Sequence, residues 1–207
     1  MKDQLIVVSG AGGFIGGNLV ASLRQQGHSH IRAVDVKPLE HWYRKFNDVE
    51  NLILDLNDKE NCEIATKGAT EVYNLAANMG GMGFIEKNKA LCMLSVLINT
   101  HMLMAAQKCG VERYFYSSSA CVYNGDLQHT RDEGNRFTPP ALKESDAYPA
   151  LAEDGYGWEK LFLSGCAATS WRTSACMCVW LVSTTSTDRG EHGSVAVKRP
   201  RRRFAVK

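Results

Sequence analysis

Tyr156 and Lys160 form a Tyr-x-x-x-Lys pair that could carry out proton transfer. Residues four apart share one face of a helix, so the lysine ammonium would lie close to the phenol. A nearby positive charge lowers the pKa of a tyrosine and makes it a better base near neutral pH. Ser119, the last of three consecutive serines, could hydrogen-bond to the same substrate hydroxyl. An ordinary pair on a helix surface is the alternative, and the glycine loop described below favours the catalytic interpretation.

Cys121 follows Ser119 by two residues, at the exit of an apolar strand expected over 113–117. A thiolate can act as a proton base, and neighbouring positive charge lowers the pKa of a thiol. A small buried thiol without chemistry is the usual fate of a cysteine and stays open as the alternative.

Gly10, Gly13 and Gly16 follow the apolar run 5–8 and precede a helix expected over 14–26. In such a segment the first glycine permits the turn, the second lets the backbone approach a pyrophosphate, and the third lets helix and strand pack closely. The helix N-terminus adds unpaired N–H groups and the positive end of a dipole. The spacing predicts a dinucleotide site, and a glycine-rich turn that binds nothing is the alternative.

Two aspartates at strand ends extend this predicted site. Asp35 lies about 20 residues after the glycine loop, where an acid binds the ribose hydroxyls of a dinucleotide. Its charge would repel a 2′-phosphate, so NAD is favoured over NADP. Asp55 follows a third apolar strand. It could hydrogen-bond to the adenine amino group or cap the next turn, and the residues alone favour neither reading.

Short apolar runs alternate with helical patterns as far as Leu163. We expect strands over 5–8, 31–35, 51–56, 72–77 and 113–117, and helices over 14–26 and 88–109. Strands that alternate with helices indicate a doubly wound parallel sheet of the α/β class, a Rossmann-like domain. The segment 124–149 is rich in Asp, Gly, Thr and Pro and is expected to be a surface loop.

The composition indicates one globular domain of the cytoplasm. Apolar residues make up 44% of the 207 residues, and the formal net charge is +2. The apolar run near the N-terminus is too short for a signal peptide or a membrane span, so we expect no membrane partner. Seven cysteines show no zinc-ligand spacing, so we expect no metal site and reduced thiols.

Longer stretches resemble the extended short-chain dehydrogenases/reductases and, among these, the family of GDP-mannose 3,5-epimerases. The stretches are GAGGFIG at 10–16, VDVKPLEHW at 34–42, NLAANMGGMGFI at 74–85, SACVY at 119–123 and LKESDAYPA at 142–150. The MGGMG segment and the cysteine are more specific than the motifs that the whole superfamily shares. The resemblance extends from residue 4 to residue 163.

The resemblance implies NAD-assisted epimerisation of GDP-mannose at C3 and C5 to GDP-L-galactose and GDP-L-gulose, a step of L-ascorbate biosynthesis. Tyr156 would take the proton of the C4 hydroxyl while NAD takes the hydride. The 4-keto sugar would then exchange protons with Cys121 and a lysine further along the chain. The family's substrate contacts match Gly80, Ser119, Ala120 and Cys121, and the intact family is expected to be homodimeric. Its cofactor contacts match Gly10, Gly13, Phe14, Ile15, Gly16, Asp35, Asp55, Leu75, Ala76, Tyr156 and Lys160.

Residues 165–207 break the resemblance. They carry eight Lys/Arg and two Asp/Glu, and no helical or strand period holds beyond a few residues. When the last base of each codon is joined to the first two of the next, the stretch can encode RFHNVYGP and GGREKAPAAF, two segments of the family. We therefore divide the chain into an NAD-binding domain, 1–164, and an irregular out-of-frame or disordered tail, 165–207. The substrate-binding domain is expected to be missing.

This interpretation makes the basic run Arg199–Arg203 an artefact of the frame, so we expect no nucleic-acid partner. The family's second acid–base lysine would fall where Arg199 stands, so we expect the chain as written to be inactive. Another nucleotide-sugar epimerase, dehydratase or decarboxylase is the nearest alternative. A non-catalytic NAD-binding protein with a genuine basic tail is the alternative from a different class.

Overall fold

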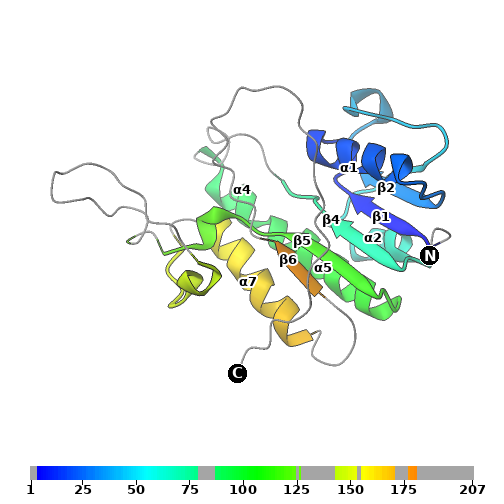
Figure 1. Ribbon diagram of the computed structural model, residues 1–207. Coiled ribbons are helices and arrows are strands. Elements are labelled where there is room, and N and C mark those ends of the chain that lie inside the picture. The colour runs from blue at the N-terminus through cyan, green and yellow to red at the C-terminus, as the bar shows by residue number, and fades with distance from the viewer. Residues whose placement is uncertain are drawn as a thin grey trace.

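The computed structural model describes residues 4–78, 87–124, 126, 143–152, 155–170 and 177–180 (Figure 1). Six strands form one sheet in the order β3-β2-β1-β4-β5-β6, and every neighbouring pair is parallel. The strands are β1 (Ile6–Ser9), β2 (Ile31–Asp35), β3 (Glu50–Ile53), β4 (Glu71–Asn74), β5 (Arg113–Ser117) and β6 (Met177–Trp180). The strand order reverses between β1 and β4, which defines a doubly wound sheet.

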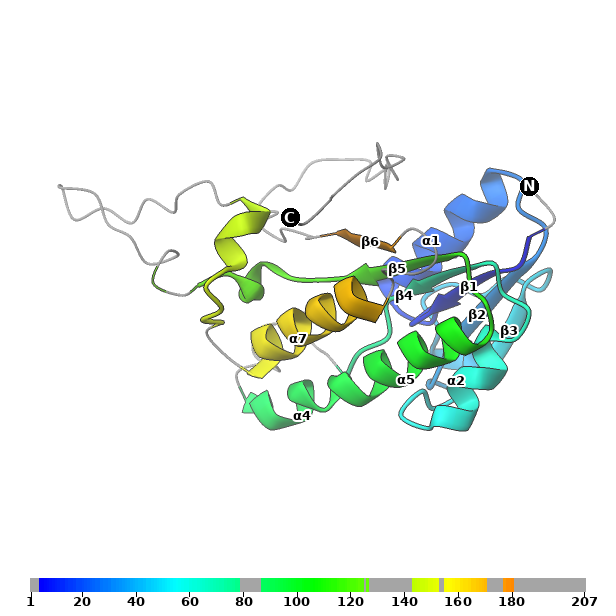
Figure 2. The same cartoon turned by 90° about the horizontal axis from the view of Figure 1, so that it is seen from below.

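Helices cover both faces of the sheet, as the view in Figure 2 shows. In the described residues, the α-helices are α1 (Phe14–Gln25), α2 (Lys59–Thr66), α4 (Lys89–Met93), α5 (Ser95–Lys108) and α7 (Gly155–Ser170). The same residues include the short 3-10 helices η1 (Leu39–His41), η2 (Ala120–Val122) and η3 (Glu144–Ala147). α1 packs on one face, and α2, α5 and α7 pack on the other.

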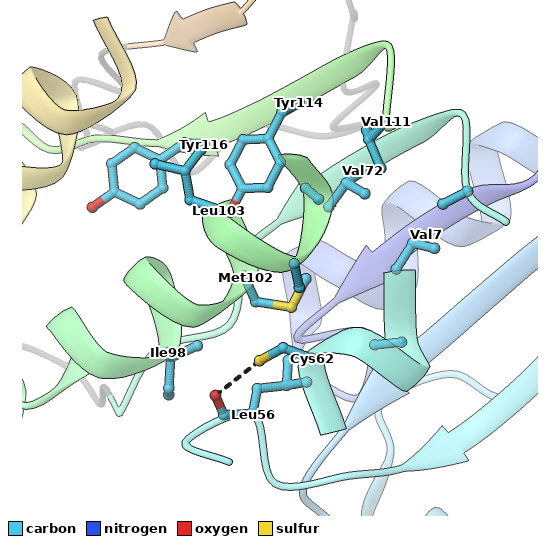
Figure 3. Packing of buried hydrophobic residues seen from close by; sticks show 14 of the residues in the cluster. Val7, Leu56, Cys62, Val72, Ile98, Met102, Leu103, Val111, Tyr114 and Tyr116 are labelled. Carbon is cyan, nitrogen blue, oxygen red and sulfur yellow. Dashed lines mark hydrogen bonds between the residues drawn. The ribbon is translucent and has the colours of Figure 1, made fainter. Parts of the chain in front are cut away.

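Alternate residues of β1 point into two separate cores. Val7 packs with side chains of α2 and α5, including Cys62 and Met102 (Figure 3). Ile6 and Val8 point the other way and pack with side chains of α1. A parallel strand that is covered on both faces needs apolar residues at every position, which explains the continuous apolar run. The buried strand gives the glycine loop that follows it a fixed starting point.

α4 and α5 together form the apolar stretch Lys89–Lys108, which has the length and composition of a membrane-spanning helix. The core helix of a globular domain has the same properties. Here 44% of the most apolar window is buried inside the protein, and Met102 and Ala106 belong to the core cluster. Because α5 also packs against α2 and α7, much of its apolar surface is used within the fold.

The predicted α/β class is confirmed, and the five predicted strands are present with shifted ends at β1, β3 and β4. The predicted helix 88–109 occurs as α4 and α5, with Leu94 between them. The helix α2 was not predicted, because its mixed sequence KENCEIAT shows a short apolar face only. Most of the predicted loop 124–149 lies outside the described residues.

Two stretches of the tail 165–207, which was predicted to be irregular, have regular structure. α7 continues past residue 164 to Ser170, and Met177–Trp180 forms β6, which pairs with β5. Unpaired backbone groups on the outer side of β5 favour the addition of a strand, and four apolar residues are too few to show a period.

Candidate dinucleotide and active site

The loops that follow β1, β2, β4 and β5 lie at the carboxyl edge of the sheet, on both sides of the reversal in strand order. Ligands of doubly wound sheets bind at this edge, in the crevice beside the reversal. The glycine loop follows β1, Asp35 ends β2, and Leu75 and Ala76 follow β4. Ser119 and Cys121 follow β5. Most of the predicted site residues therefore share one edge of the molecule.

The glycine loop is packed too closely to admit side chains at two positions. Gly10 has a φ of +72°, a backbone conformation that side chains rarely adopt, and an added Cβ would lie 2.9 Å from the carbonyl carbon of Leu75. At Gly16 an added Cβ would overlap the carbonyl oxygen of Gly10 and lie 2.8 Å from the Cα of Ala11. The loop thus turns sharply, and the first turn of α1 packs against the backbone of the loop.

The N-terminus of α1 faces outward beside this loop. Gly13 precedes the helix in an extended conformation, and no side-chain hydrogen bond caps the helix there. Phe14 and Ile15, both predicted cofactor contacts, are 65% and 61% exposed. Unpaired N–H groups at a helix start attract phosphate, which is the property the sequence interpretation required.

Asp35 is 8% exposed, and its carboxylate hydrogen-bonds to the glycine loop. Its Oδ2 accepts a hydrogen bond from the backbone N–H of Gly12 at 2.9 Å, and its Oδ1 accepts one from the N–H of Lys37 at 3.0 Å. Each carboxylate oxygen can accept further hydrogen bonds, so ribose hydroxyls could still bind. The spacing predicted the position of Asp35 but not its contact with Gly12.

Asp55 organises the turn before α2. Its Oδ1 accepts hydrogen bonds from the backbone N–H of Asn57 at 2.9 Å and from the side-chain amide of Asn57 at 2.8 Å. The turn-capping role that the sequence left open is therefore present. The Oδ2 of this carboxylate makes neither of these bonds, and a contact with adenine stays a prediction.

Tyr156 and Lys160 lie on α7, and both are buried, with 7% and 3% of their surface exposed. The ammonium of Lys160 lies 5.6 Å from the centre of the Tyr156 ring and 4.7 Å from that of Tyr116 on β5. Cys92 of α4 and Cys121 of η2 pack against Tyr156. The structure thus brings the predicted tyrosine, lysine and cysteine together, while the catalytic roles stay predictions.

Gly157 sets the distance between α7 and the loop that carries Cys121. An added Cβ at Gly157 would overlap the carbonyl oxygen of Cys121. Within this loop, Ser119 Oγ accepts a hydrogen bond from the N–H of Cys121 at 3.2 Å and begins η2. Ser119 is therefore partly engaged in holding the loop. Gly80, the remaining predicted substrate contact, lies outside the described residues.

Three features that sequence reasoning missed lie in or beside this site. Ser118 is 6% exposed, and its Oγ has no hydrogen-bond partner among the described residues. Glu159 and Asn99 are 1% and 0% exposed and hydrogen-bond to each other, the amide of Asn99 donating to Glu159 Oε1. The sequence carried a signal for two of these residues. Glu159 is an acid next to Lys160, and Asn99 is a polar residue within an apolar helix.

Burial shifts the pKa of both charged residues on this part of α7. It raises the pKa of Glu159, although Lys160 and the hydrogen bonds from Asn99 and Tyr116 act in the opposite direction. It lowers the pKa of Lys160, and the charge of Glu159 acts in the opposite direction. The two charges therefore stabilise one another against desolvation.

The residues present fit an NAD molecule. Gly10 and Gly16 permit the tight backbone packing of the loop, no side chain caps the start of α1, and Asp35 carries acceptors for ribose hydroxyls. The unpartnered Ser118 hydroxyl after β5 provides a further buried polar group at the same sheet edge. The fold and site together define a dinucleotide-binding protein of the doubly wound α/β class.

Comparison with known proteins assigns the family. The model of the NAD dependent epimerase/dehydratase family matches residues 6–174, and the chain belongs to this family, whose cofactor is NAD. It is 44% identical over 157 residues to GDP-mannose 3,5-epimerase 1 of Oryza sativa subsp. japonica, covering 75% of this chain and 39% of that protein. It is 42% identical over 161 residues to GDP-mannose 3,5-epimerase of Arabidopsis thaliana, covering 77% and 41%.

A solved structure supports the fold. The UDP-glucose 4-epimerase of Thermus thermophilus, in complex with NAD, superposes with a TM-score of 0.65 at 20% identity. The match covers 85% of this chain and 54% of that one. At this identity the likeness establishes the fold alone. The chain spans only 39–41% of the length of the two curated relatives named above.

Proposed function

We propose that the chain is the NAD-binding half of a GDP-mannose 3,5-epimerase. The observation that carries the proposal is the cluster of Cys121, Tyr156 and Lys160 beyond the end of β5, in a chain 42–44% identical to plant enzymes of that name. A nucleotide-sugar is then the substrate class, and the carboxyl edge of the sheet is its binding side.

The residues of this half divide the chemistry between them. Tyr156, with the Lys160 ammonium beside its ring, removes the proton of the C4 hydroxyl. NAD held by the glycine loop and Asp35 would supply a hydride acceptor for C4 and would give the hydride back, so that no net oxidation would remain. The C4 ketone makes the hydrogens at C3 and C5 acidic, and Cys121 removes or delivers a proton at one of these carbons. Ser119 hydrogen-bonds to the hydroxyl at which Tyr156 acts.

The second acid–base group lies outside this half. In the shifted reading frame a lysine falls beside the position of Arg199. The segment GGREKAPAAF contains this lysine, and the segment RFHNVYGP lies before it. We propose that residues 165–207 are the out-of-frame translation of a gene for a GDP-mannose 3,5-epimerase. The chain as written then binds NAD but does not complete two epimerisations.

A second copy of the protein is the partner we propose for the intact enzyme. The outer sides of α4, α5 and α7 expose Leu91, Met93, Leu94, Leu97, Trp158 and Phe162, each at least 42% accessible. A mostly apolar groove of about 380 Å³ between these helices is lined by Met93, Val96, Trp158 and Phe162, together with Glu159. Exposed apolar side chains around such a groove are typical of a subunit interface. Cys62, Cys92, Cys109, Cys121 and Cys166 are free thiols, which is consistent with the cytoplasmic location that we propose.

The proposal is tested by following the shifted frame in the encoding DNA and expressing the protein that it specifies. We expect that frame to be open through both family segments and beyond. In D₂O with NAD, the longer protein should convert GDP-mannose to products that carry deuterium at C3 and C5. Cys121→Ser in that protein should reduce the rate by about 10²–10⁴, the usual contribution of one acid–base group.

Three outcomes would contradict this function. Stop codons in the shifted frame would overturn the proposal for the tail. Inversion at C4 without deuterium at C3 and C5 would identify another nucleotide-sugar epimerase. Deuterium exchange that is unaffected by Cys121→Ser would remove Cys121 from the mechanism.

A further inference from the structure

A chain of buried polar side chains runs from β1 to α7 through the protein interior. Ser9 Oγ donates to Asn74 Oδ1 at 2.7 Å, and Asn74 Nδ2 donates to Asn99 Oδ1 at 2.8 Å. Asn99 Nδ2 in turn donates to Glu159 Oε1 at 2.5 Å. These four residues are all at most 1% exposed. This series of hydrogen bonds links β1, the strand before the glycine loop, to Glu159, the residue next to Lys160.

The carboxylate of Glu159 is fixed on one side and open on the other. Its Oε1 accepts hydrogen bonds from Asn99 and, at 3.2 Å, from the hydroxyl of Tyr116. Its Oε2 has no hydrogen-bond partner among the described residues and lies 3.8 Å from the Nζ of Lys160. Two neutral donors therefore orient one oxygen, while the other faces the ammonium.

We propose that Glu159 is a positioning residue, whose carboxylate, oriented by Asn99, acts as the buried counter-ion that holds the Lys160 ammonium at the ring of Tyr156. Glu159 acts on the site through Lys160, whose ammonium lies beside the Tyr156 ring. The inference deepens the proposed function, since it rests on the roles given there to Tyr156 and Lys160.

The cost of burying charge supports this assignment. An ionised lysine at 3% exposure loses most of its hydration, and an unpaired buried ammonium tends to lose its proton. A neutral amine would place no positive charge beside Tyr156. A residue needed for packing alone would be apolar, because buried ion pairs are seldom more stable than apolar replacements. Glu159 thus maintains a charge that the chemistry needs.

Among the described residues, the groups packed around Lys160 and Tyr156 include other titratable side chains. Those that face this part of α7 are Tyr116 from β5, Cys92 from α4 and Cys121 from η2, with Tyr156 on α7 itself. Burial raises the pKa of Tyr116, so it stays neutral at physiological pH. Among the described residues, Glu159 alone forms an ion pair with Lys160.

The first test measures the proton affinity of Lys160 in the full ligand-free chain. With lysine labelled with ¹³C at Cε, the Lys160 signal is assigned by its loss in Lys160→Arg and followed in a pH titration by NMR. Glu159→Gln should lower the proton-binding constant of Lys160 at least about tenfold, because a charge partner is lost. Glu159→Asp should restore part of it. Glu63→Gln, which removes a glutamate paired with Lys108 at the surface, should leave it unchanged.

The second test uses stability and does not depend on the NMR signal. Urea unfolding is measured for Glu159→Gln, Lys160→Met and the double variant. If the residues form a counter-ion pair, the double variant should be more stable than the sum of the two losses predicts. Additive losses, or an unchanged Lys160 titration in a folded Glu159→Gln protein, would overturn the inference. Both tests omit substrate and NAD, so their outcome is independent of the epimerase test above.

Discussion

Replacement of Gly16 by alanine should abolish NAD binding by the full chain. The added Cβ would overlap the carbonyl oxygen of Gly10 and lie 2.8 Å from the Cα of Ala11, both backbone groups that cannot rotate away. The glycine loop would have to move away from α1, which displaces the surface that receives the pyrophosphate. We expect the affinity for NAD to fall at least about 100-fold, or about 2.7 kcal/mol, by isothermal titration calorimetry.

Gly165→Ala is the matched control for this change. Gly165 lies on α7, and an added Cβ there meets no heavy atom within 4 Å. The control protein should bind NAD as the unaltered chain does. Equal NAD affinity in Gly16→Ala and Gly165→Ala would show that the loop does not hold the cofactor in the way described. Circular dichroism of both variants separates a local change in the loop from general unfolding.

Gly157→Ala should destabilise the protein and loosen the loop that carries Cys121. The new methyl group would overlap the carbonyl oxygen of Cys121 and lie 3.1 Å from the Cβ of Ala152. Overpacking of this kind costs about 1–3 kcal/mol, which exceeds the gain of up to about 1 kcal/mol from alanine in a helix. Urea unfolding should show the loss, and alkylation of Cys121 by iodoacetamide should become faster as the loop separates from α7.

Gly165→Ala again isolates the cause, because it makes the same change on the same helix. At Gly165 the higher helix propensity of alanine is not offset by a steric clash, so the unfolding free energy should rise by up to about 1 kcal/mol. If both variants of α7 behave alike, close contact between Gly157 and the Cys121 loop does not determine stability. Peptide mapping by mass spectrometry distinguishes Cys121 from the other thiols that react.

The local parts of this architecture could be predicted from the sequence. The glycine loop and the strand that ends at Asp35 follow from short segments in which residue type and spacing fix the backbone. The Tyr156–Lys160 pair is local too, since one helix turn sets its geometry. In each case the controlling interactions lie within a few residues of one another or follow a recurrent pattern.

The parts that could not be predicted depend on contacts between distant segments. The bond between Asn99 and Glu159 joins residues 60 positions apart, so no periodicity reveals it. β6 forms because β5 offers an unpaired edge, not because its own four residues specify a strand. The contact of Asp35 with the glycine loop likewise emerges only once β1 and β2 are side by side.

The most direct test of the NAD site is a calorimetric titration of the full chain with NAD and, separately, with NADP. We predict that NAD binds and that NADP binds at least about tenfold more weakly, because the Asp35 carboxylate at the end of β2 would repel a 2′-phosphate. Failure to bind NAD, or tighter binding of NADP, by a chain that circular dichroism shows to be folded would contradict the central claim.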